Sequence, residues 1–591
     1  MRRFQILAFV TGILLAAAMR AQVPDDSPRL ASLVRNGNVY LSLQDAIALA
    51  LENNLDVALQ RLGPRFADAD VKRARAGALP RGFAPSVREG PKSVSAVGAD
   101  VLAPLLGPGP ETNLSIAGQT PLSSGPLPPA LDPILTGNIR RDHLTAPQLN
   151  SFLVGTTALV NDLTTADFGW QKGLLTGGEI FAGFENSHQT LNHARYDLSP
   201  FSTSSLGITF KQPLLRGFGR ALNSRFIRVA NNSRTQSNLV FEQQVISTVA
   251  AVVRLYWDLV SLNEDVKVRR QVLERAEKLL SDNQAQVEAG TRAPIEEVRA
   301  RAEVARSRRD LIAAEGLVRQ QETVLKDYLT RKTVSDPSLA AVRIIPTDPL
   351  RIDRSERIPS TSELAENASK SRPDLAQARI QIESTRLALK GSRNALLPSL
   401  DLVATVRNNA LAGNVNSLTL PGATPHTPDP MIVGGYGTAL SQLLHRDFPD
   451  YGVGLQLTIP LRNRTADADY TRDRLTLRQQ EMRLQQLIKQ VHVEIENALI
   501  VLEQARATLE AVEGEREFQE QALAAEEDKL AVGASTTFLV IQYQRDLAQA
   551  RSAEVDAQAG YVKAKAALDR ASNTLLDRHG ISITDTEVVV H

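Results

Sequence analysis

The sequence of 591 residues contains no cysteine, and this absence excludes several kinds of protein chemistry. A chain without thiols cannot form disulfide bonds, use a cysteine nucleophile or carry a lipid on a cysteine. Any attachment to a membrane must therefore come from the folded structure itself.

The chain also lacks an excess of charge of either sign. It has 67 basic and 66 acidic residues, so its formal net charge is +1. This balance creates no overall field that would attract nucleic acid or anionic lipid. We therefore expect no nucleic-acid partner.

Long hydrophobic runs are missing as well, apart from one at the N-terminus. Arg2 and Arg3 precede an apolar run from Ile6 to Ala18, the layout of a secretory signal peptide. We predict a signal peptide over residues 1–21, with an uncleaved anchor as the alternative. Farther on there is no run of about 18 consecutive apolar residues, so a membrane role would have to use β-strands.

Signals of catalysis and of cofactor binding are absent too. The eight histidines are scattered, without a His-x-x-x-His pair or an acidic partner at ligand spacing. Gly217 and Gly219 belong to a junction that lacks the Lys-Ser/Thr or strand context needed to bind phosphate. We expect no enzyme activity, no metal and no cofactor.

What the sequence does contain is an internal duplication. Residues 43–80 can be laid on residues 360–398, and both segments place an Asp 24 positions before the Pro of a Leu-Pro pair. The glycines at Gly290 and Gly533 also correspond, since each stands 15 residues before an alanine in a charged helical segment. Each half therefore reads as a helix, a strand region, a very long helix, a Gly turn and another long helix.

The very long helices give the strongest local signal. Apolar residues recur every three or four positions, with a mean step in the second half of (512 − 484)/8 = 3.5, the heptad value of a left-handed supercoil. Each helix of roughly 50 residues would reach about 75 Å. The stripes are Val245, Val249, Val252, Tyr256, Leu259, Val266, Leu273, Ala276, Leu280 and Val287, then Leu484, Leu487, Val491, Ile495, Ala498, Leu502, Ala505, Leu509 and Val512.

Between the helices, apolar and polar residues alternate as they do in strands. The segments are about 157–172, 178–186 and 204–212 in the first half, and 400–407 and 453–459 in the second. Alternation fits either a half-buried sheet or a barrel with lipid outside and water inside. Because so few strands cannot build a sandwich core, closing a barrel with other copies is favoured. Two stretches rich in Pro, Gly and Ser, about 84–147 and 408–450, are predicted as loops.

With these features in place, the chain resembles the TolC-like outer membrane efflux protein family. The resemblance rests on the helix at 43–54, on Leu397-Pro398-Ser399, and on the strand-to-helix junctions at 212–219 and 457–461. It covers nearly everything from Leu41 to Asp577 apart from the two loop-rich inserts. Together, the order of these motifs and the duplication are specific, although no single motif is decisive.

The resemblance implies an α+β membrane protein. It would be a homotrimeric outer-membrane β-barrel with about four strands per chain, continued by a long coiled α-helical barrel in the periplasm. Its partners would be outer-membrane lipid, a periplasmic adaptor (membrane fusion) protein and an inner-membrane pump. The expected function is a passive export duct of a tripartite efflux or type I secretion system. A soluble periplasmic coiled-coil adaptor or scaffold is the alternative.

The predicted organisation follows the duplication. The first repeat spans 22–340, with a loop over about 84–147 and a helical hairpin over about 232–331. The second repeat spans 341–577, with a strand hairpin over about 399–460 and a helical hairpin over about 465–577, and residues 578–591 form a C-terminal tail.

Candidate functional residues cluster at the two Gly turns, where glycine can supply the left-handed end of a helix. The resemblance implies that these hairpins form the periplasmic tip, whose polar side chains close the pore. Glu296 occupies the position of a tip acid, with solvated helical charge as the alternative, whereas Leu539 and Gln542 stand where the second hairpin would carry acids, so no cation-binding constriction is expected there. The candidates for gating and adaptor docking are Gly290, Thr291, Arg292, Glu296, Glu297, Gly533, Ser535 and Thr536.

Overall fold

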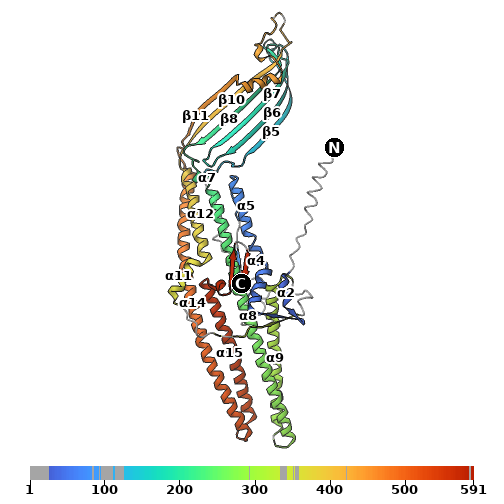
Figure 1. Cartoon of the computed structure of the whole chain (residues 1–591), viewed down its shortest axis with the longest axis vertical. Helices are drawn as coiled ribbons and strands as arrows, with labels where there is room; N and C mark the ends of the chain where they lie inside the picture. The colour runs from blue at the N-terminus through green and yellow to red at the C-terminus, as the bar shows by residue number, and fades with distance from the viewer. Residues whose placement is uncertain are drawn as a thin grey trace.

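The computed structural model shows an elongated molecule with a curved sheet at one end and two helical hairpin tips at the other (Figure 1). It describes residues 26–82, 86–91, 93–94, 111–112, 125–291, 293–332, 342–350, 352, 359–420, 422, 424–584 and 587–590. The predicted signal peptide over residues 1–21 lies outside the described residues.

The first half contains the sheet's first four strands and one long helical hairpin. Its elements are α2 (Pro28–Leu33), β1 (Val34–Arg35), β2 (Asn38–Leu41), α3 (Leu43–Asn53), α4 (Leu55–Gln60), α5 (Gly63–Arg75), β3 (Val87–Arg88), β4 (Glu111–Thr112), β5 (Ile134–Pro147), α6 (Ser151–Val154), β6 (Ala158–Gly173), β7 (Glu179–Leu191), β8 (Leu198–Pro213), α7 (Arg220–Asn223), α8 (Arg225–Glu288), α9 (Pro294–Leu329) and β9 (Arg343–Pro346).

The second half follows the same order of helix, strands and long hairpin. Its elements are α11 (Thr361–Ser371), α12 (Pro373–Ala395), β10 (Ser399–Val415), η3 (Pro430–Ile432), α13 (Tyr436–His445), β11 (Phe448–Thr458), α14 (Arg464–Ala531), α15 (Thr537–Ala571), α16 (Leu575–Arg578), β12 (Ile581–Thr584) and β13 (Glu587–Val590). The last two strands pair as a hairpin within the predicted tail.

Both halves break their leading helix at the same point. Asn54 ends α3 with φ −61° and ψ 127°, and Arg372 ends α11 with φ −65° and ψ 127°. In the first half the Asn54 side chain accepts hydrogen bonds from the backbone N–H groups of Asp56 and Val57, and in the second half Pro373 takes the first helical position. Because an extended residue interrupts the helix in each half, the chain changes direction there. The helices that follow, ending with α5 and α12, lead toward the sheet.

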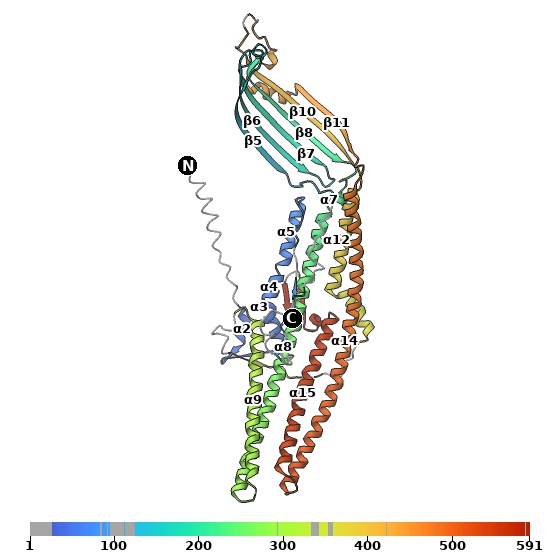
Figure 2. The same cartoon turned by 180° about the vertical axis from the view of Figure 1, so that it is seen from behind.

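The long helices bury the middle of the apolar stripes that their periodicity predicts, whereas Leu273, Leu280 and Val287 near the first tip are half-buried. Helix α8 has 64 residues and α14 has 68. Val249, Tyr256 and Leu259 of α8 and Ile495 of α14 are completely buried. The two hairpins lie side by side along their length (Figures 1 and 2).

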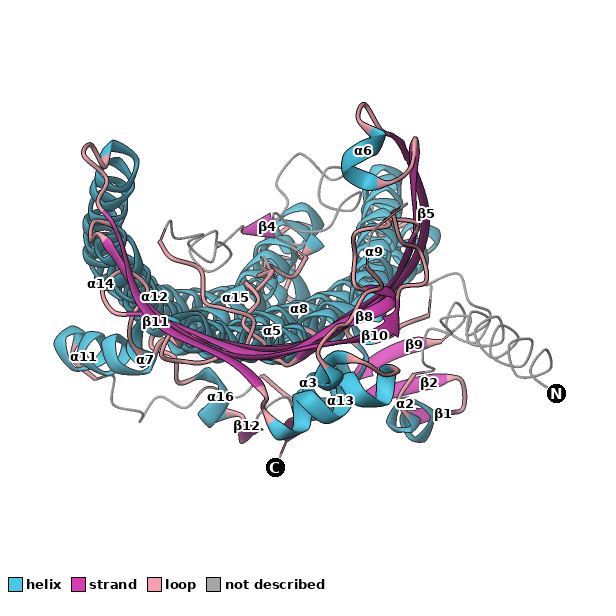
Figure 3. Ribbon diagram, turned by 90° about the horizontal axis from the view of Figure 1, so that it is seen from above, coloured by secondary structure: helices cyan, strands magenta, loops and turns pink. Residues whose placement is uncertain are grey.

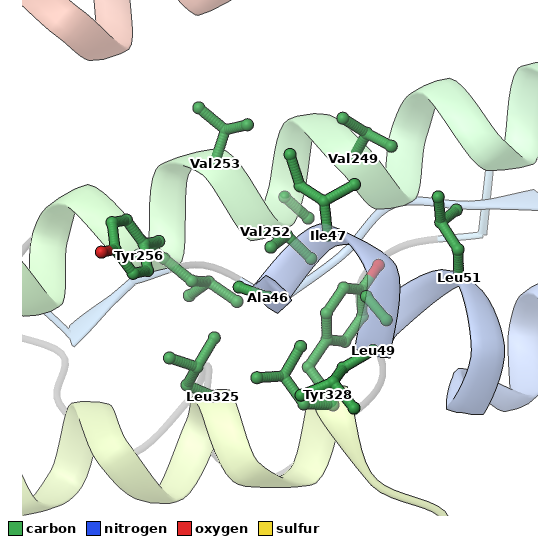
Figure 4. Close-up of a cluster of buried hydrophobic side chains, with 14 of the residues drawn as sticks. Ala46, Ile47, Leu49, Leu51, Val249, Val252, Val253, Tyr256, Leu325 and Tyr328 are labelled. Carbon is green, nitrogen blue, oxygen red and sulfur yellow. The ribbon is translucent and has the colours of Figure 1, made fainter. Parts of the chain in front are cut away.

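The largest core lies near the middle of the molecule, where α3 packs between α8 and α9. Ile47 points toward Val249 and Val252, while Leu49 points toward Tyr328 (Figure 4). Full burial of such aliphatic side chains contributes roughly 1.5–3 kcal/mol each. This core fixes the start of the chain against the first long hairpin.

The main sheet has six strands, in the order β11-β10-β8-β7-β6-β5, and every neighbouring pair is antiparallel. The strands expected at about 157–172, 178–186 and 204–212 are present as β6, β7 and β8. The expected number of about four strands per chain is wrong, because β5 and β6 add a hairpin to the edge of β7.

The predicted loops at 84–147 and 408–450 are wrong in part, and residues 95–110 and 113–124 of the first lie outside the described residues. Residues 134–147 form β5, which pairs with β6 along its whole length. The second stretch contains the end of β10, the helix α13 and the start of β11. In β5 the charged run Arg140-Arg141-Asp142 interrupts the apolar alternation, so the strand is specified by its pairing more than by its own pattern.

One described helix is long and apolar enough to cross a membrane by composition alone. It is α8, and 78% of the relevant window is buried inside the protein. Since a core helix passes the same test, this window is explained by the packing of α8 against α3 and α9.

Candidate functional site

The curved sheet has one apolar and one polar face, and seen from above it forms an arc (Figure 3). Paired residues in neighbouring strands share a face, so the register assigns each side chain to one side. The convex face carries Leu135, Ile139, Phe168, Trp170, Ile180, Ala182, Leu206, Ile208, Phe210, Leu402, Ala404, Val406, Tyr451, Val453, Leu455 and Leu457. Several are largely exposed, with Leu135 at 78% and Val453 at 79%, as lipid-facing residues would be in an isolated chain.

The concave face is mainly polar or glycine and encloses a hollow of about 1000 Å³. Its lining includes Thr136, Asn138, Thr165, Asp167, Gly169, Gly183, Glu185, Ser187, Thr203, Ser205, Arg407 and Asn409. Phe181, Leu411 and Phe448 add apolar side chains to this lining. The polar side chains suit contact with water. The sheet therefore separates an apolar outside from a wet inside.

Polar side chains on the concave face bond across strands rather than standing alone. The Ser205 hydroxyl donates to the Glu185 carboxylate at 3.2 Å, and the Lys211 ammonium lies 3.2 Å from the Asp401 carboxylate. Such cross-strand pairs contribute roughly 0.2–1 kcal/mol each and hold the register that keeps polar groups inside.

A compact junction joins the sheet to the long helices. The Asn223 amide donates to the Gly217 carbonyl at 2.9 Å, and the Gly217 N–H donates to the Asn394 side chain at 2.7 Å. The buried Arg225 guanidinium donates to the carbonyls of Leu222 and Pro126. Burial lowers the pKa of Arg225 to about 10, so it stays charged at neutral pH. The sequence motif at 212–219 marked this junction, but not the role of Arg225.

At the far end, Gly290 and Gly533 close the two helical hairpins, as the sequence predicts. Their φ angles are +74° and +76°. The Gly290 N–H donates to the Val287 carbonyl, and the Thr291 N–H donates to the Gln286 carbonyl. This pair of hydrogen bonds is typical of a helix end that requires a left-handed residue. The second hairpin has the same pattern.

The acids of the first tip bond within their own hairpin. Glu296 accepts from Arg299 of the same helix at 2.8 Å. Glu297 accepts from Arg301 at 2.6 Å and from Gln284 of α8 at 3.2 Å. Arg292, one of the predicted candidates for gating and docking, lies outside the described residues. A gating role for Glu296 therefore stays a prediction.

The second tip is held by Glu526 instead of an acidic ring. Its carboxylate accepts from the Ser535 hydroxyl and pairs with the Lys529 ammonium at 3.0 Å. These two partners lower the pKa of Glu526, the Ser535 hydrogen bond being the larger cause. The Thr536 hydroxyl caps α15 by accepting from the Leu539 N–H. Ser535 and Thr536 thus shape the turn itself.

Sequence reasoning missed the contact that joins the two hairpins near their tips. Arg545 of α15 makes a two-pronged hydrogen bond to Glu303 of α9, whose side chain is only 9% exposed. This contact raises the pKa of Arg545. The similar placement of the two residues, 13 positions after Gly290 and 12 positions after Gly533, is the signal that could have suggested it.

Farther up, α8 and α15 are joined by acids that face the interior. The Lys563 ammonium lies 2.6 Å from the Asp258 carboxylate, whose side chain is 2% exposed. Ser552 donates to Asp265 at 2.6 Å, and Ser261 donates to Asp556 at 3.2 Å. The hairpins are therefore coupled along their length by polar contacts rather than by an apolar seam alone.

The tips also expose apolar side chains. Val532 is 79% exposed, Phe538 54%, Ile295 52% and Val298 59%. Within the part of the chain that the structure describes, no group of three or more metal-binding side chains comes together. The exposed apolar side chains at the tips are suited to contact with another protein.

The sequence matches the family described as outer membrane efflux protein over residues 165–331 and 364–574, which together exceed half of the chain. No curated protein matches the sequence of this chain.

Three solved structures illustrate the likeness in fold. The CmeC outer membrane channel of Campylobacter jejuni is 13% identical with a TM-score of 0.55, over 94% of this chain and 93% of that one. The MtrE outer membrane channel of Neisseria gonorrhoeae in its open state is 16% identical with a TM-score of 0.52, over 94% and 98%. VceC, an outer membrane protein of Vibrio cholerae, is 12% identical with a TM-score of 0.53, over 90% and 95%.

Proposed function

Because the chain belongs to the outer membrane efflux protein family, we propose that it is the channel subunit of a tripartite efflux or type I secretion system. It is an outer-membrane efflux channel with a helical periplasmic part. The finer proposal is that three copies form a passive duct, while an inner-membrane pump supplies the energy.

The two-faced sheet is the observation that carries this proposal. Apolar side chains cover its convex face and polar ones its concave face, as in a wall between lipid and water. Strands β8 and β11 of this sheet lead through short connections into α8 and α14. Copies arranged around one axis would therefore join a membrane pore to a periplasmic tube.

The exposed apolar side chains at the tips support docking of a periplasmic adaptor. Val532 and Phe538 stand at the second turn and Ile295 at the first, far from the sheet. An apolar patch on a polar helical hairpin is typical of a protein contact. We assign this contact to the adaptor, with Gly290, Thr291, Ser535 and Thr536 shaping the surface.

A soluble periplasmic adaptor or scaffold, the alternative expectation, is disfavoured by the sheet. A soluble protein would have to cover the exposed side chains of Leu135, Ile139, Val453 and Leu455. Membrane fractionation and heat-dependent gel mobility test the two readings. We expect a membrane-bound trimer that resists dissociation without heating and conducts ions in planar bilayers, whereas a soluble periplasmic monomer would refute the proposal.

A further inference from the structure

The sheet contains a hairpin that the duplication does not explain. In the second half, β10 and β11 lead into α14, and in the first half β7 and β8 lead into α8 in the same way. This leaves β5 and β6 without a counterpart. The family match begins at residue 165, inside β6, so β5 also lies outside the part of the chain that matches the family.

The added hairpin has the two-faced character of the rest of the wall. On the convex side, Leu135 of β5 pairs with Trp170 of β6, and both are exposed. On the concave side, Asn138 pairs with Asp167 beside the same hollow as the other strands. The hairpin therefore continues the lipid-facing band and the water-facing lining by two strands.

The base of the hairpin is fixed to the helical part of the molecule. The Gly173 N–H at the end of β6 donates to the Ala130 carbonyl at 2.7 Å, and the Leu131 N–H donates to the Ala76 carbonyl at 3.0 Å. Ala76 ends α5, which packs against α8. The hairpin is thus supported from below as an element of the wall and is not a loose extension of a loop.

Within the part of the chain that the structure describes, the two outer strands, β5 and β11, each leave one edge without a partner in the sheet. In a membrane, backbone groups on a strand edge need hydrogen-bond partners, because lipid supplies none. Six strands are too few to close on themselves, since the smallest such barrels have about eight. Five antiparallel pairings separate the two edges, so β5 of one copy and β11 of the next would also run antiparallel.

We propose that β5 pairs with β11 of a second copy, so that the trimer closes a barrel of 18 strands rather than 12. This inference rests on the proposed trimeric channel. Barrel diameter grows roughly in proportion to strand number, so the membrane pore would be about 1.5 times as wide as one built from four strands per chain. The added hairpin is therefore what sets the width of the exit.

Engineered cysteines provide a direct test, because the chain has none of its own. Val453→Cys on β11 is combined in turn with Leu135→Cys, Gly137→Cys or Ile139→Cys, which lie on the convex face of β5. We expect covalent trimers under oxidising conditions in at least one combination. In the matched set, Val453→Cys is combined with Ile180→Cys, Ala182→Cys or Phe184→Cys on β7, and we expect monomers throughout. Cross-linking through β7 and not through β5 would overturn the proposal.

Excising residues 131–172 should reverse this result. Ala130 and Gly173 already lie in hydrogen-bond contact, so joining them removes the hairpin with little change at its base. We expect β7 to become the edge strand and to form the cross-link with Val453→Cys. Failure of β7 to cross-link in excised trimers would contradict the inference.

Electron microscopy of the unmodified trimer supplies a test that does not depend on any variant. We expect a ring of 18 strands, and a ring of 12 in a trimer that conducts ions would overturn this inference while leaving the proposed function intact. A chain that is monomeric or conducts no ions would instead refute the proposed function.

Discussion

At the scale of single residues, Arg545 and Glu303 are the side chains that tie one hairpin to the other near the tips. Replacing Arg545 with Ala should let the hairpins separate and raise the resting conductance of the trimer in planar bilayers. Because the pair is partly exposed, we expect the substitution to remove about 1 kcal/mol or less per chain from the free energy that holds the two hairpins together. Arg308→Ala is the control, since Arg308 pairs with Glu277 inside the first hairpin at 3.0 Å. Equal conductance changes in both variants would contradict a role specific to the contact between hairpins.

Glu296 and Arg292 give a second gating prediction. If they link neighbouring tips, Glu296→Ala, Arg292→Ala and the double variant should raise resting conductance while trimers still assemble. Glu296 also bonds to Arg299 on its own helix, so Arg299→Ala separates the loss of that bond from the loss of a gate. Wild-type conductance in all three test variants would make these residues ordinary solvated charges.

Asp556 predicts a dependence of stability on pH. Burial raises the pKa of its carboxyl, and nearby Asp265 raises it further, while Ser261, Lys563 and Arg269 lower it. A carboxyl whose pKa is higher in the folded state destabilises that state when ionised, and the loss is recovered as the pH falls through the raised pKa. We expect Asp556→Asn to raise the temperature of trimer dissociation at pH 7, with a smaller gain at lower pH. A constant gain over this range would show that ionisation is not the cause.

At the scale of elements, the two Gly turns set the ends of the hairpins. Gly290→Ala and Gly533→Ala meet no atom within 4 Å, so their cost is conformational, about 1 kcal/mol each for a left-handed residue. We expect faster cleavage of the tips in limited proteolysis. Gly316→Ala is the matched control, because Gly316 lies inside α9 and also meets no neighbour. There alanine should slow cleavage, since it favours a helix by roughly 0.5–1 kcal/mol.

The elements that the sequence revealed are those with an uninterrupted period. The stripe through Val249 and Tyr256 predicted α8, and the alternation around Leu206 predicted β8. Strand β5 was missed because its period is broken by charges, and helix α13 because it is only 10 residues long. In both cases packing decides the structure: β5 is completed by β6, and α13 rests on the sheet through Ala439 and Leu443.

The candidate site was predictable only where one residue determines the backbone locally. Gly290 and Gly533 predict the two turns from the sequence, and the structure places both residues in the left-handed region. The Arg545–Glu303 contact joins residues 242 positions apart, so no pattern within one helix gives it, and only a comparison of the two hairpins could have suggested it. The partner of a surface charge such as Glu296 is set by the rotamers of its neighbours, which spacing alone does not fix.

At the scale of the whole molecule, hydrogen bonds at the end of α12 connect the sheet to both long helices. The Gly217 N–H donates to Asn394 at 2.7 Å, and the Asn463 amide donates to the Ala395 carbonyl at 3.0 Å. The turn before each long helix is thereby fixed to the end of α12. The proposed gate lies at the opposite end of the molecule from this junction, so we expect a docking partner to shift the gate without breaking these hydrogen bonds.

The two faces of the sheet give the last prediction, at adjacent residues of the central strand β8. Ile208 points outward on the convex face, and Thr209 points inward with the polar lining. Ile208→Arg should place a charge in lipid at a cost of about 2–4 kcal/mol near the midplane, so folded trimer in the outer membrane should fall several-fold. Thr209→Arg adds the same charge toward water, so it should assemble normally and shift ion selectivity toward anions. Normal assembly of Ile208→Arg together with loss of Thr209→Arg would mean that the faces are assigned the wrong way round.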